Sequence, residues 1–247
     1  MNLKTIVADI LTNSLLGSLI KRYYNNVVPF FEARINVDNK YINNRTVAQI
    51  FWKIYESAEV RFIKKYLEKD KDTVELGSSI GGVSSIIGLN KDPEAKLFCF
   101  EANSFLVPTI ELNLNENGIQ NHYVYNNAVG PLESDVIGFQ LGVSNLTSKI
   151  SSAGSSFEVP TLDLRSFIKK NFLHDYNFVC DIEGAEVYII FEQTEVLNNC
   201  STAIIELHET EYENKKFSID ELNSLILSRC SLYLEDHYGA VYVYKKK

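Results

Sequence analysis

The chain has 247 residues, enough for one α/β domain with an extension, and 45% of them are hydrophobic, as in ordinary globular proteins. Its net charge of −8 gives no attraction toward a polyphosphate backbone, so nucleic acid is not expected as the main partner. No apolar run reaches about 18 residues and the N-terminus does not resemble a signal peptide, so we expect no integral membrane segment and a cytoplasmic location. The four cysteines form no C-x-x-C pair and are expected to be buried thiols of a reducing compartment.

Residues 1–54 are predicted to form a helical extension. Apolar side chains recur at helical spacing in residues 3–24, which predicts an amphipathic helix that packs on the core or on a second copy of the chain. Docking on a membrane surface is the less favoured alternative for this helix. Residues 33–42 alternate and predict a short hairpin with its turn at Asp38-Asn39, and a further helix is predicted over 46–68.

A regular alternation of strands and helices follows, and it predicts an α/β fold with a mostly parallel sheet covered on both faces. The chain ends in two strand-like runs, 231–236 and 240–245, whose connection His237-Tyr238-Gly239 predicts an antiparallel hairpin. A parallel core closed by such a hairpin is the layout of the Rossmann-like class I methyltransferase sheet. The expected strands are 73–76, 97–101, 122–129, 177–182 and 202–207, and the expected helices are 82–88, 104–117, 163–171 and 185–197.

Residues 144–156 interrupt this alternation with six serines, a threonine and a glycine. Such a segment buries little apolar surface, so it is predicted to be a mobile loop, either a surface connection or a lid over the substrate. The surface connection is the favoured interpretation.

Two apolar runs end in acidic residues, as the first two strands of a nucleoside-binding sheet do. Glu75 begins a turn with the spacing E-x-G-x-x-x-G, through Gly77 and Gly81, and Glu101 ends the next expected strand. The glycines allow a close backbone approach to a ligand, and Glu101 can accept both ribose hydroxyls. The spacing differs from the G-x-G-x-x-G dinucleotide fingerprint. The acidic side chain of Glu75 disfavours a pyrophosphate and favours a cationic ligand. S-adenosylmethionine is a nucleoside that carries a sulfonium and an amine, so it fits this site.

A third acidic group follows the strand expected over 177–182. Asp181 and Glu183 are predicted to converge on the cleft at the carboxyl end of that strand, beside Glu75 and Glu101. Glu186, in the first turn of the following helix, is more simply a helix cap or a structural anchor.

The strand expected over 202–207 ends in Glu206 and His208, which alternation places on one face. Removal of a proton from a hydroxyl is a chemistry available to His208, because the unperturbed histidine pKa lies near neutrality, although a single histidine is more often structural. Together with Asp181 and Glu183, these two residues could also ligate a divalent ion, but no spacing requires one, and no metal is predicted.

With these pieces in this order, the chain resembles the FkbM-type methyltransferases, which are S-adenosylmethionine-dependent enzymes that act mainly on hydroxyl oxygens. The resemblance covers roughly residues 55–210. Its pieces are Tyr55-Glu56, Glu75-Leu-Gly-Ser-Ser-Ile-Gly81, Phe100-Glu101-Ala-Asn103, Asn113-Leu-Asn115, Asn127-Ala-Val-Gly130, Pro160-Thr-Leu-Asp163, Asp181-Ile-Glu-Gly-Ala-Glu186 and Ile205-Glu206-Leu-His208, of which the one that begins at Asp181 is the most specific.

The resemblance implies a methyltransferase domain over 55–247 with S-adenosylmethionine as its cofactor. Asp181 and Glu183 would face the transferred methyl group and the acceptor and place them electrostatically. His208 completes the candidate catalytic set as the favoured proton acceptor. The cofactor would be contacted at its methionine end by Glu75, Gly77, Ser78 and Gly81, at its ribose by Glu101 and Asn103, at its adenine by Asn127 and Ala128, and near the sulfonium by Asp181.

The predicted function is O-methylation of a sugar hydroxyl in a surface glycan or its precursor, judged from the resemblance. A polyketide or another secondary metabolite is the alternative acceptor. Two other classes stay open on the residues alone: a nicotinamide-dependent oxidoreductase on the same fold, and a binding protein without catalysis. Besides a small-molecule or glycan substrate, the only partner expected is a second copy of the chain, through the N-terminal helix.

Overall fold

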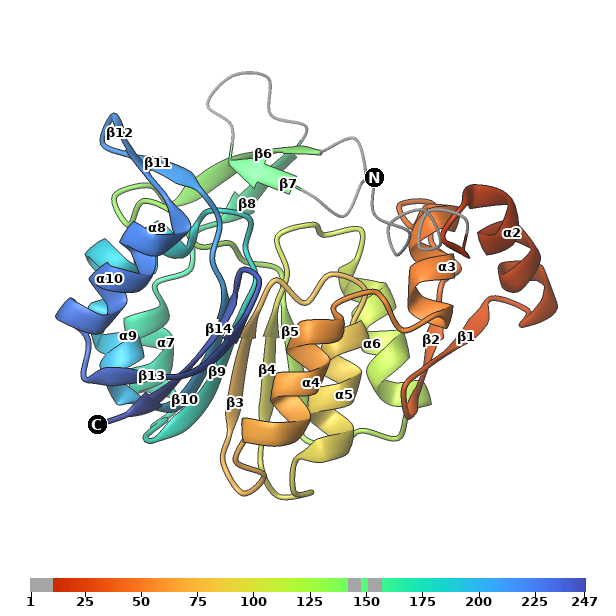
Figure 1. The fold of residues 1–247 in the computed structure, drawn as a ribbon, viewed down its shortest axis with the longest axis horizontal. Helices are drawn as coiled ribbons and strands as arrows, with labels where there is room; N and C mark the ends of the chain where they lie inside the picture. The colour runs from red at the N-terminus through yellow and green to blue at the C-terminus, as the bar shows by residue number, and fades with distance from the viewer. Residues whose placement is uncertain (1–10, 142–147, 151–156) are drawn as a thin grey trace.

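The computed structural model describes residues 11–141, 148–150 and 157–247. A seven-stranded sheet runs through the middle of the molecule, with helices packed against both faces (Figure 1). The helices are α2 (Ser14–Tyr23), α3 (Asn44–Phe51), α4 (Ser57–Tyr66), α5 (Gly82–Asn90), α6 (Val107–Glu116), α7 (Leu164–Lys170), α8 (Glu186–Glu192), α9 (Thr194–Asn199) and α10 (Ile219–Arg229). The strands are β1 (Val27–Phe30), β2 (Ala33–Asn36), β3 (Thr73–Leu76), β4 (Leu97–Phe100), β5 (His122–Tyr125), β6 (Val136–Leu141), β7 (Ser148–Ile150), β8 (Phe157–Pro160), β9 (Tyr176–Cys180), β10 (Cys200–Glu206), β11 (Thr210–Tyr212), β12 (Lys215–Phe217), β13 (Leu232–Tyr238) and β14 (Val241–Lys246).

The central sheet has the strand order β13-β14-β10-β9-β3-β4-β5. Strands β10, β9, β3, β4 and β5 pair in parallel, whereas β14 is antiparallel to both β10 and β13. The predicted C-terminal hairpin is therefore present, and its second strand is inserted between the first and the rest of the sheet. These observations confirm the predicted α/β class with a mostly parallel sheet closed by an antiparallel hairpin.

Two clusters of buried apolar side chains fill the layers between the sheet and its helices. On one face, α4, α5 and α6 pack together with the β1–β2 hairpin, through side chains that include Phe30, Ile86 and Ile110. On the other face, α7 to α10 pack through side chains that include Leu164 and Val187. The described part of residues 1–54 thus shares a core with the α/β layers. The domain boundary at residue 54 stays a prediction.

The N-terminal segment differs from its predicted structure. Of the helix predicted over 3–24, the structure describes α2, which begins after Asn13, whose Oδ1 accepts a hydrogen bond from the Leu16 N–H at 2.9 Å. The hairpin predicted over 33–42 is wrong. Strands β1 and β2 instead turn at residues 31–32, where Phe31 adopts a left-handed φ of 51°, a conformation that side-chain alternation does not reveal.

The continuous helix predicted over 46–68 is also wrong, because residues 52–56 separate α3 from α4. Lys53 and Glu56 have left-handed φ values of 56° and 42°, through which an α-helix cannot continue. The break brings the Tyr55 hydroxyl to 3.1 Å from Ser79 Oγ, beside the glycine turn after β3. The interruption therefore carries this segment to the carboxyl edge of the sheet.

The region after β5 contains a second sheet that was not predicted. Strand β5 ends at Tyr125, and β6 pairs antiparallel with both β7 and β8. Strand β7 lies inside the predicted serine-rich loop. The rest of residues 144–156 lies outside the described residues, so the lid stays a prediction.

Three elements of the C-terminal half were also missed. The helix predicted over 185–197 is two helices, α8 and α9, which meet at the fully buried Gln193. The β11–β12 hairpin and α10 had no predicted counterpart. A signal for α10 was present in the sequence, since Ser218 and Glu221 form a capping box at its start.

Candidate active site

A cavity of about 450 Å³ lies at the carboxyl ends of β3, β4 and β9. Its place is the point where the chain order of the sheet reverses, which is where open α/β sheets bind ligands. The volume falls in the usual range for small-molecule pockets. Apolar side chains such as Phe100, Phe139 and Leu162 line one part of it, and carboxylates line another. This arrangement suits a ligand with an apolar ring at one end and charge at the other.

The glycine turn after β3 brings backbone to the cavity wall. Gly77 lines the cavity and has φ 85°. A Cβ atom at this position would lie 1.7 Å from the backbone oxygen of Asp181, so only glycine fits. Gly81, with φ 77°, does not line the cavity and instead begins α5 as its N-cap.

Glu101 follows β4 and lines the cavity. Its Oε2 accepts a hydrogen bond from the Ser79 N–H and its Oε1 accepts one from the Asn103 N–H, both at 2.7 Å. Burial raises the pKa of Glu101 to about 7, against the lowering effect of these two N–H groups. Each carboxylate oxygen carries a further lone pair, so the fixed carboxylate can also accept hydroxyl groups from a ligand.

Three of the predicted cofactor positions lie behind the cavity wall. Glu75 is 2% exposed, and its Oε2 accepts hydrogen bonds from Ser78 Oγ at 2.8 Å and Ser84 Oγ at 2.5 Å. Burial raises the pKa of Glu75. Ser78 and Asn103 are also buried, and none of Glu75, Ser78 and Asn103 lines the cavity. These side chains fix the turns that carry Gly77 and Glu101.

Asn127 and Ala128 reach the cavity from the segment after β5. Ala128 forms a parallel bridge with Thr161, and its N–H donates to the Pro160 carbonyl at 3.1 Å. The Leu162 N–H donates back to the Ala128 carbonyl at 2.8 Å. These bonds join the segments after β5 and β8 into one wall of the cavity.

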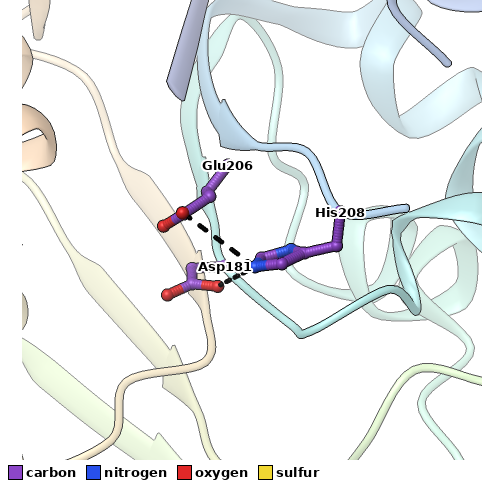
Figure 2. Close-up of side chains that lie close together, drawn as sticks. All are labelled: Asp181, Glu206 and His208. Carbon is purple, nitrogen blue, oxygen red and sulfur yellow. Dashed lines mark ion pairs between the residues drawn. The ribbon is translucent and has the colours of Figure 1, made fainter. Parts of the chain in front are cut away.

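At the carboxyl ends of β9 and β10, four carboxylates surround one imidazole. Figure 2 shows two of them, Asp181 and Glu206, beside His208. His208 Nδ1 lies 3.2 Å from Oε1 of Glu186, which also accepts a neighbouring backbone N–H at 3.1 Å. His208 Nε2 lies 3.8 Å from both Asp181 Oδ1 and Glu183 Oε2, and 4.0 Å from Glu206 Oε1. Glu186 thus anchors the imidazole, while the other three carboxylates face its second nitrogen.

The electrostatics of this group differ from the sequence expectation for His208. Burial lowers the His208 pKa, but the hydrogen bond with Glu186 and the nearby carboxylates outweigh it and raise the pKa to about 9. The unperturbed histidine pKa near neutrality therefore does not apply to His208 in the free protein. Burial raises the pKa of Asp181 well above its usual range, and repulsion from Glu206 adds to the effect.

The protein family described as "Methyltransferase FkbM domain" matches residues 69–236, which is more than half of the chain. The chain belongs to the FkbM methyltransferase family. It is therefore an S-adenosylmethionine-dependent methyltransferase, and the oxidoreductase alternative is set aside. No curated protein sequence matches the chain.

Several solved structures resemble this FkbM methyltransferase at low identity. A ribosomal protein L11 methylase from Lactobacillus delbrueckii subsp. bulgaricus has 13% identity and a TM-score of 0.47, over 79% of each chain. An rRNA methylase from Streptococcus thermophilus has 10% identity and a TM-score of 0.45, over 78% of this chain and 95% of its own. A protein of the NADB-Rossmann superfamily from Streptococcus agalactiae has 12% identity and a TM-score of 0.45, over 76% and 67%. The family assignment rests on the family match alone.

Sequence reasoning missed part of the site of this FkbM methyltransferase. Glu56 and Glu59, from the start of α4, extend the acidic group, and the ligand oxygens of these two and of Glu206 all lie within 4.8 Å of one another. Glu59 is 6% exposed, and burial raises its pKa to about 7. The sequence predicted one continuous helix over 46–68, and nothing in that pattern indicated that Glu59 would join the acidic group.

Helix α3 contributes polar residues to the cavity, among them Arg45 and Gln49. They precede the segment that carried the family resemblance, so the sequence did not connect them with the cofactor turns. Among residues 11–141, 148–150 and 157–247, no helix has the length and apolar character needed to cross a bilayer.

Proposed function

We propose that this FkbM methyltransferase moves the methyl group of S-adenosylmethionine to a hydroxyl oxygen, and that the acceptor is a sugar hydroxyl of a surface glycan or its precursor. One observation carries the cofactor placement. Gly77, Glu101, Asn127 and Asp181, which come from four separate segments, line a single cavity at the carboxyl ends of adjacent strands.

In this proposal the cofactor lies across the strand ends. Glu101 accepts the ribose hydroxyls with the lone pairs that its two backbone partners leave available. The adenine lies beside Asn127 and Ala128, against the apolar side chains of the cavity. The methionine end passes Gly77, where the missing side chain allows close approach. The sulfonium and the ammonium group are cations, and the carboxylates around Asp181 attract them.

The acceptor part of the proposal rests on the polar side of the same cavity. Arg45 and Gln49 of α3, together with Asn43 at the start of that helix, offer donors and acceptors for hydrogen bonds to a hydroxylated molecule. Such a wall favours a sugar over the more apolar polyketide. The cytoplasmic location and a homo-oligomer through the N-terminal helix stay predictions.

The reaction is an in-line displacement in which the carbon–sulfur bond breaks and a carbon–oxygen bond forms. S-adenosylhomocysteine leaves as a neutral thioether, and the acceptor oxygen gives up its proton. Asp181 and Glu183 line the cavity and His208 does not, so we assign the proton to one of these two carboxylates. His208 acts as a positioning residue for them. The main work of the protein is to hold the two reactants in line.

Incubation with methyl-labelled S-adenosylmethionine and fractionated glycans and sugar precursors tests the proposal. Mass spectrometry should find the label on a sugar hydroxyl, and Glu183→Gln or Asp181→Asn should lower the rate by roughly 10²–10⁴-fold if that carboxylate takes the proton. Label found only on nitrogen or carbon would contradict O-methylation. Label on a polyketide hydroxyl, with none on any sugar, would favour the alternative acceptor.

A further inference from the structure

We propose that Asp181, Glu206 and His208 form a binding site for one divalent cation of the Mg²⁺ and Mn²⁺ class. The ion would hold the acceptor oxygen beside the cavity wall, since Asp181 belongs both to this group and to the cavity lining. That role rests on the proposed function, whereas the binding of the ion can be measured without cofactor or acceptor.

The three side chains already stand at the spacing of metal ligands. One ligand atom from each lies within 4.8 Å of the other two, and His208 Nε2 is 3.8 Å from Asp181 Oδ1 and 4.0 Å from Glu206 Oε1. Figure 2 shows the two carboxylates and the imidazole pointing toward one another. A point roughly 2.1–2.5 Å from all three atoms exists for a triangle of this size, which spans the coordination distances of Mg²⁺, Mn²⁺ and Ca²⁺.

The imidazole is oriented as a metal-bound histidine is. Its Nδ1 bonds to Glu186, a carboxylate that is 2% exposed. Its Nε2 forms no hydrogen bond within the described part of the chain, because the nearest carboxylate oxygens are 3.8 Å away. A carboxylate on one ring nitrogen fixes the tautomer and leaves the other nitrogen to ligate.

Unsatisfied carboxylates around this point call for a cation. Asp181 Oδ1 is shielded from solvent and accepts no hydrogen bond. Glu59 is 6% exposed, and its carboxyl group lies within 4.8 Å of the carboxyl groups of Glu56 and Glu206. In the ion pairs of the described chain, the only base that meets Asp181, Glu183 and Glu206 is His208. A cation at this point would satisfy Asp181 Oδ1 and reduce the repulsion among these carboxyl groups.

The donor set selects the type of ion. Carboxylate oxygens suit Mg²⁺, Ca²⁺ and Mn²⁺, whereas an imidazole suits the later transition metals. Two carboxylates with one imidazole favour Mn²⁺, with Mg²⁺ as its abundant competitor. Glu183 also faces His208 Nε2 but is outside the ligand group. It then remains as the carboxylate that takes the acceptor proton.

Titration of the full chain with Mn²⁺, followed by the loss of the free-ion electron paramagnetic resonance signal, tests the site. We expect one Mn²⁺ per chain, displaced by Mg²⁺. Asp181→Asn and His208→Ala should each weaken binding by at least about 10-fold, since even the outer partners of metal ligands are worth 10- to 100-fold. Glu209→Gln removes an exposed charge near the site in sequence and serves as the matched control.

No binding at millimolar Mn²⁺, or equal binding by the wild type and all three variants, would overturn the site. If a variant fails to fold, the wild-type protein decides: bound Mn²⁺ should broaden the ring resonances of His208 before those of the other three histidines. Uniform broadening would overturn the proposal. Methyl transfer that is unchanged after chelation would overturn the catalytic role, and S-adenosylhomocysteine binding, measured separately, reports on the methyltransferase proposal itself.

Discussion

Replacing Glu101 by glutamine keeps the size of the side chain and removes one of its two acceptor oxygens. In the free protein those oxygens accept backbone N–H groups of Ser79 and Asn103 at 2.7 Å, and an amide nitrogen cannot accept either bond. In the proposed complex each oxygen also accepts a ribose hydroxyl, and a hydrogen bond to a charged group contributes about 1.5–3 kcal/mol. Glu101→Gln loses one such bond and weakens the other. We expect cofactor binding to weaken by about 2–4 kcal/mol, roughly 30- to 900-fold in Kd.

The melting temperature with and without S-adenosylhomocysteine measures this loss. At a ligand concentration of 100 times the wild-type Kd, binding stabilises the native state by about 2.7 kcal/mol. For a chain of this size that is a shift of about 5–11 °C. A variant weakened by about 100-fold gains only about 0.4 kcal/mol at the same concentration, a shift of about 1–2 °C.

Glu94→Gln is the matched control, because Glu94 is exposed and lies before β4, at the opposite end of that strand from Glu101. Its shift should equal that of the wild type. A folded Glu101→Gln protein with the full wild-type shift would refute the placement of the ribose at Glu101. A melting shift with NADH and none with S-adenosylhomocysteine would refute the cofactor reasoning altogether.

The remaining predictions concern the turn, the pH dependence and the reacting carboxylates. Gly77→Ala places a Cβ atom 1.7 Å from the Asp181 backbone oxygen at a φ of 85°. Urea denaturation should therefore show that the free energy of unfolding falls by more than about 2 kcal/mol. An unchanged urea midpoint would contradict this geometry. Glu101 and Glu59 have folded pKa values of about 7 against an ordinary 4.5, so the folded state binds more protons between these values. Stability should therefore fall as the pH rises from about 4.5 to 7, by up to roughly 3 kcal/mol per carboxyl, and a urea midpoint that rises over this window would disprove it. His208, with a folded pKa of about 9, adds a further loss between about 6.5 and 9. Asp181→Asn should keep the S-adenosylhomocysteine melting shift while methyl transfer falls, and full activity at saturating acceptor would place the chemistry elsewhere.

Much of the sheet was predictable because its signals are local. Each buried parallel strand is a short apolar run, and helices with an apolar face lie between them, so the order of the five parallel strands β3, β4, β5, β9 and β10 follows from periodicity. The acids and glycines that end those runs must lie at one edge, because parallel strands end on the same side of a sheet. Gly77, Glu101 and Asp181 could therefore be expected to line one cavity before any contact was known.

The two wrong predictions in the N-terminal region have a common physical origin in backbone conformations that ordinary residues adopt under tertiary constraint. Phe31, Lys53 and Glu56 take left-handed φ values that their side chains do not favour, so the true hairpin turn and the break between α3 and α4 left no mark in the sequence pattern. That break brings Glu56 and Glu59 to the acidic group and Tyr55 to the glycine turn.

The sequence by itself determined the family, the sheet and the types of chemical group at its edge, since these depend on periodicity and on residues that end strands. The tertiary structure alone decided which of those groups face the ligand. It placed Glu75, Ser78 and Asn103 behind the wall and Asn127 and Ala128 on it. It also raised the pKa of the His208 imidazole, because a pKa depends on the distance to every neighbouring carboxylate. Glu186 of α8 and the residues at the ends of β9 and β10 come together only when the sheet forms.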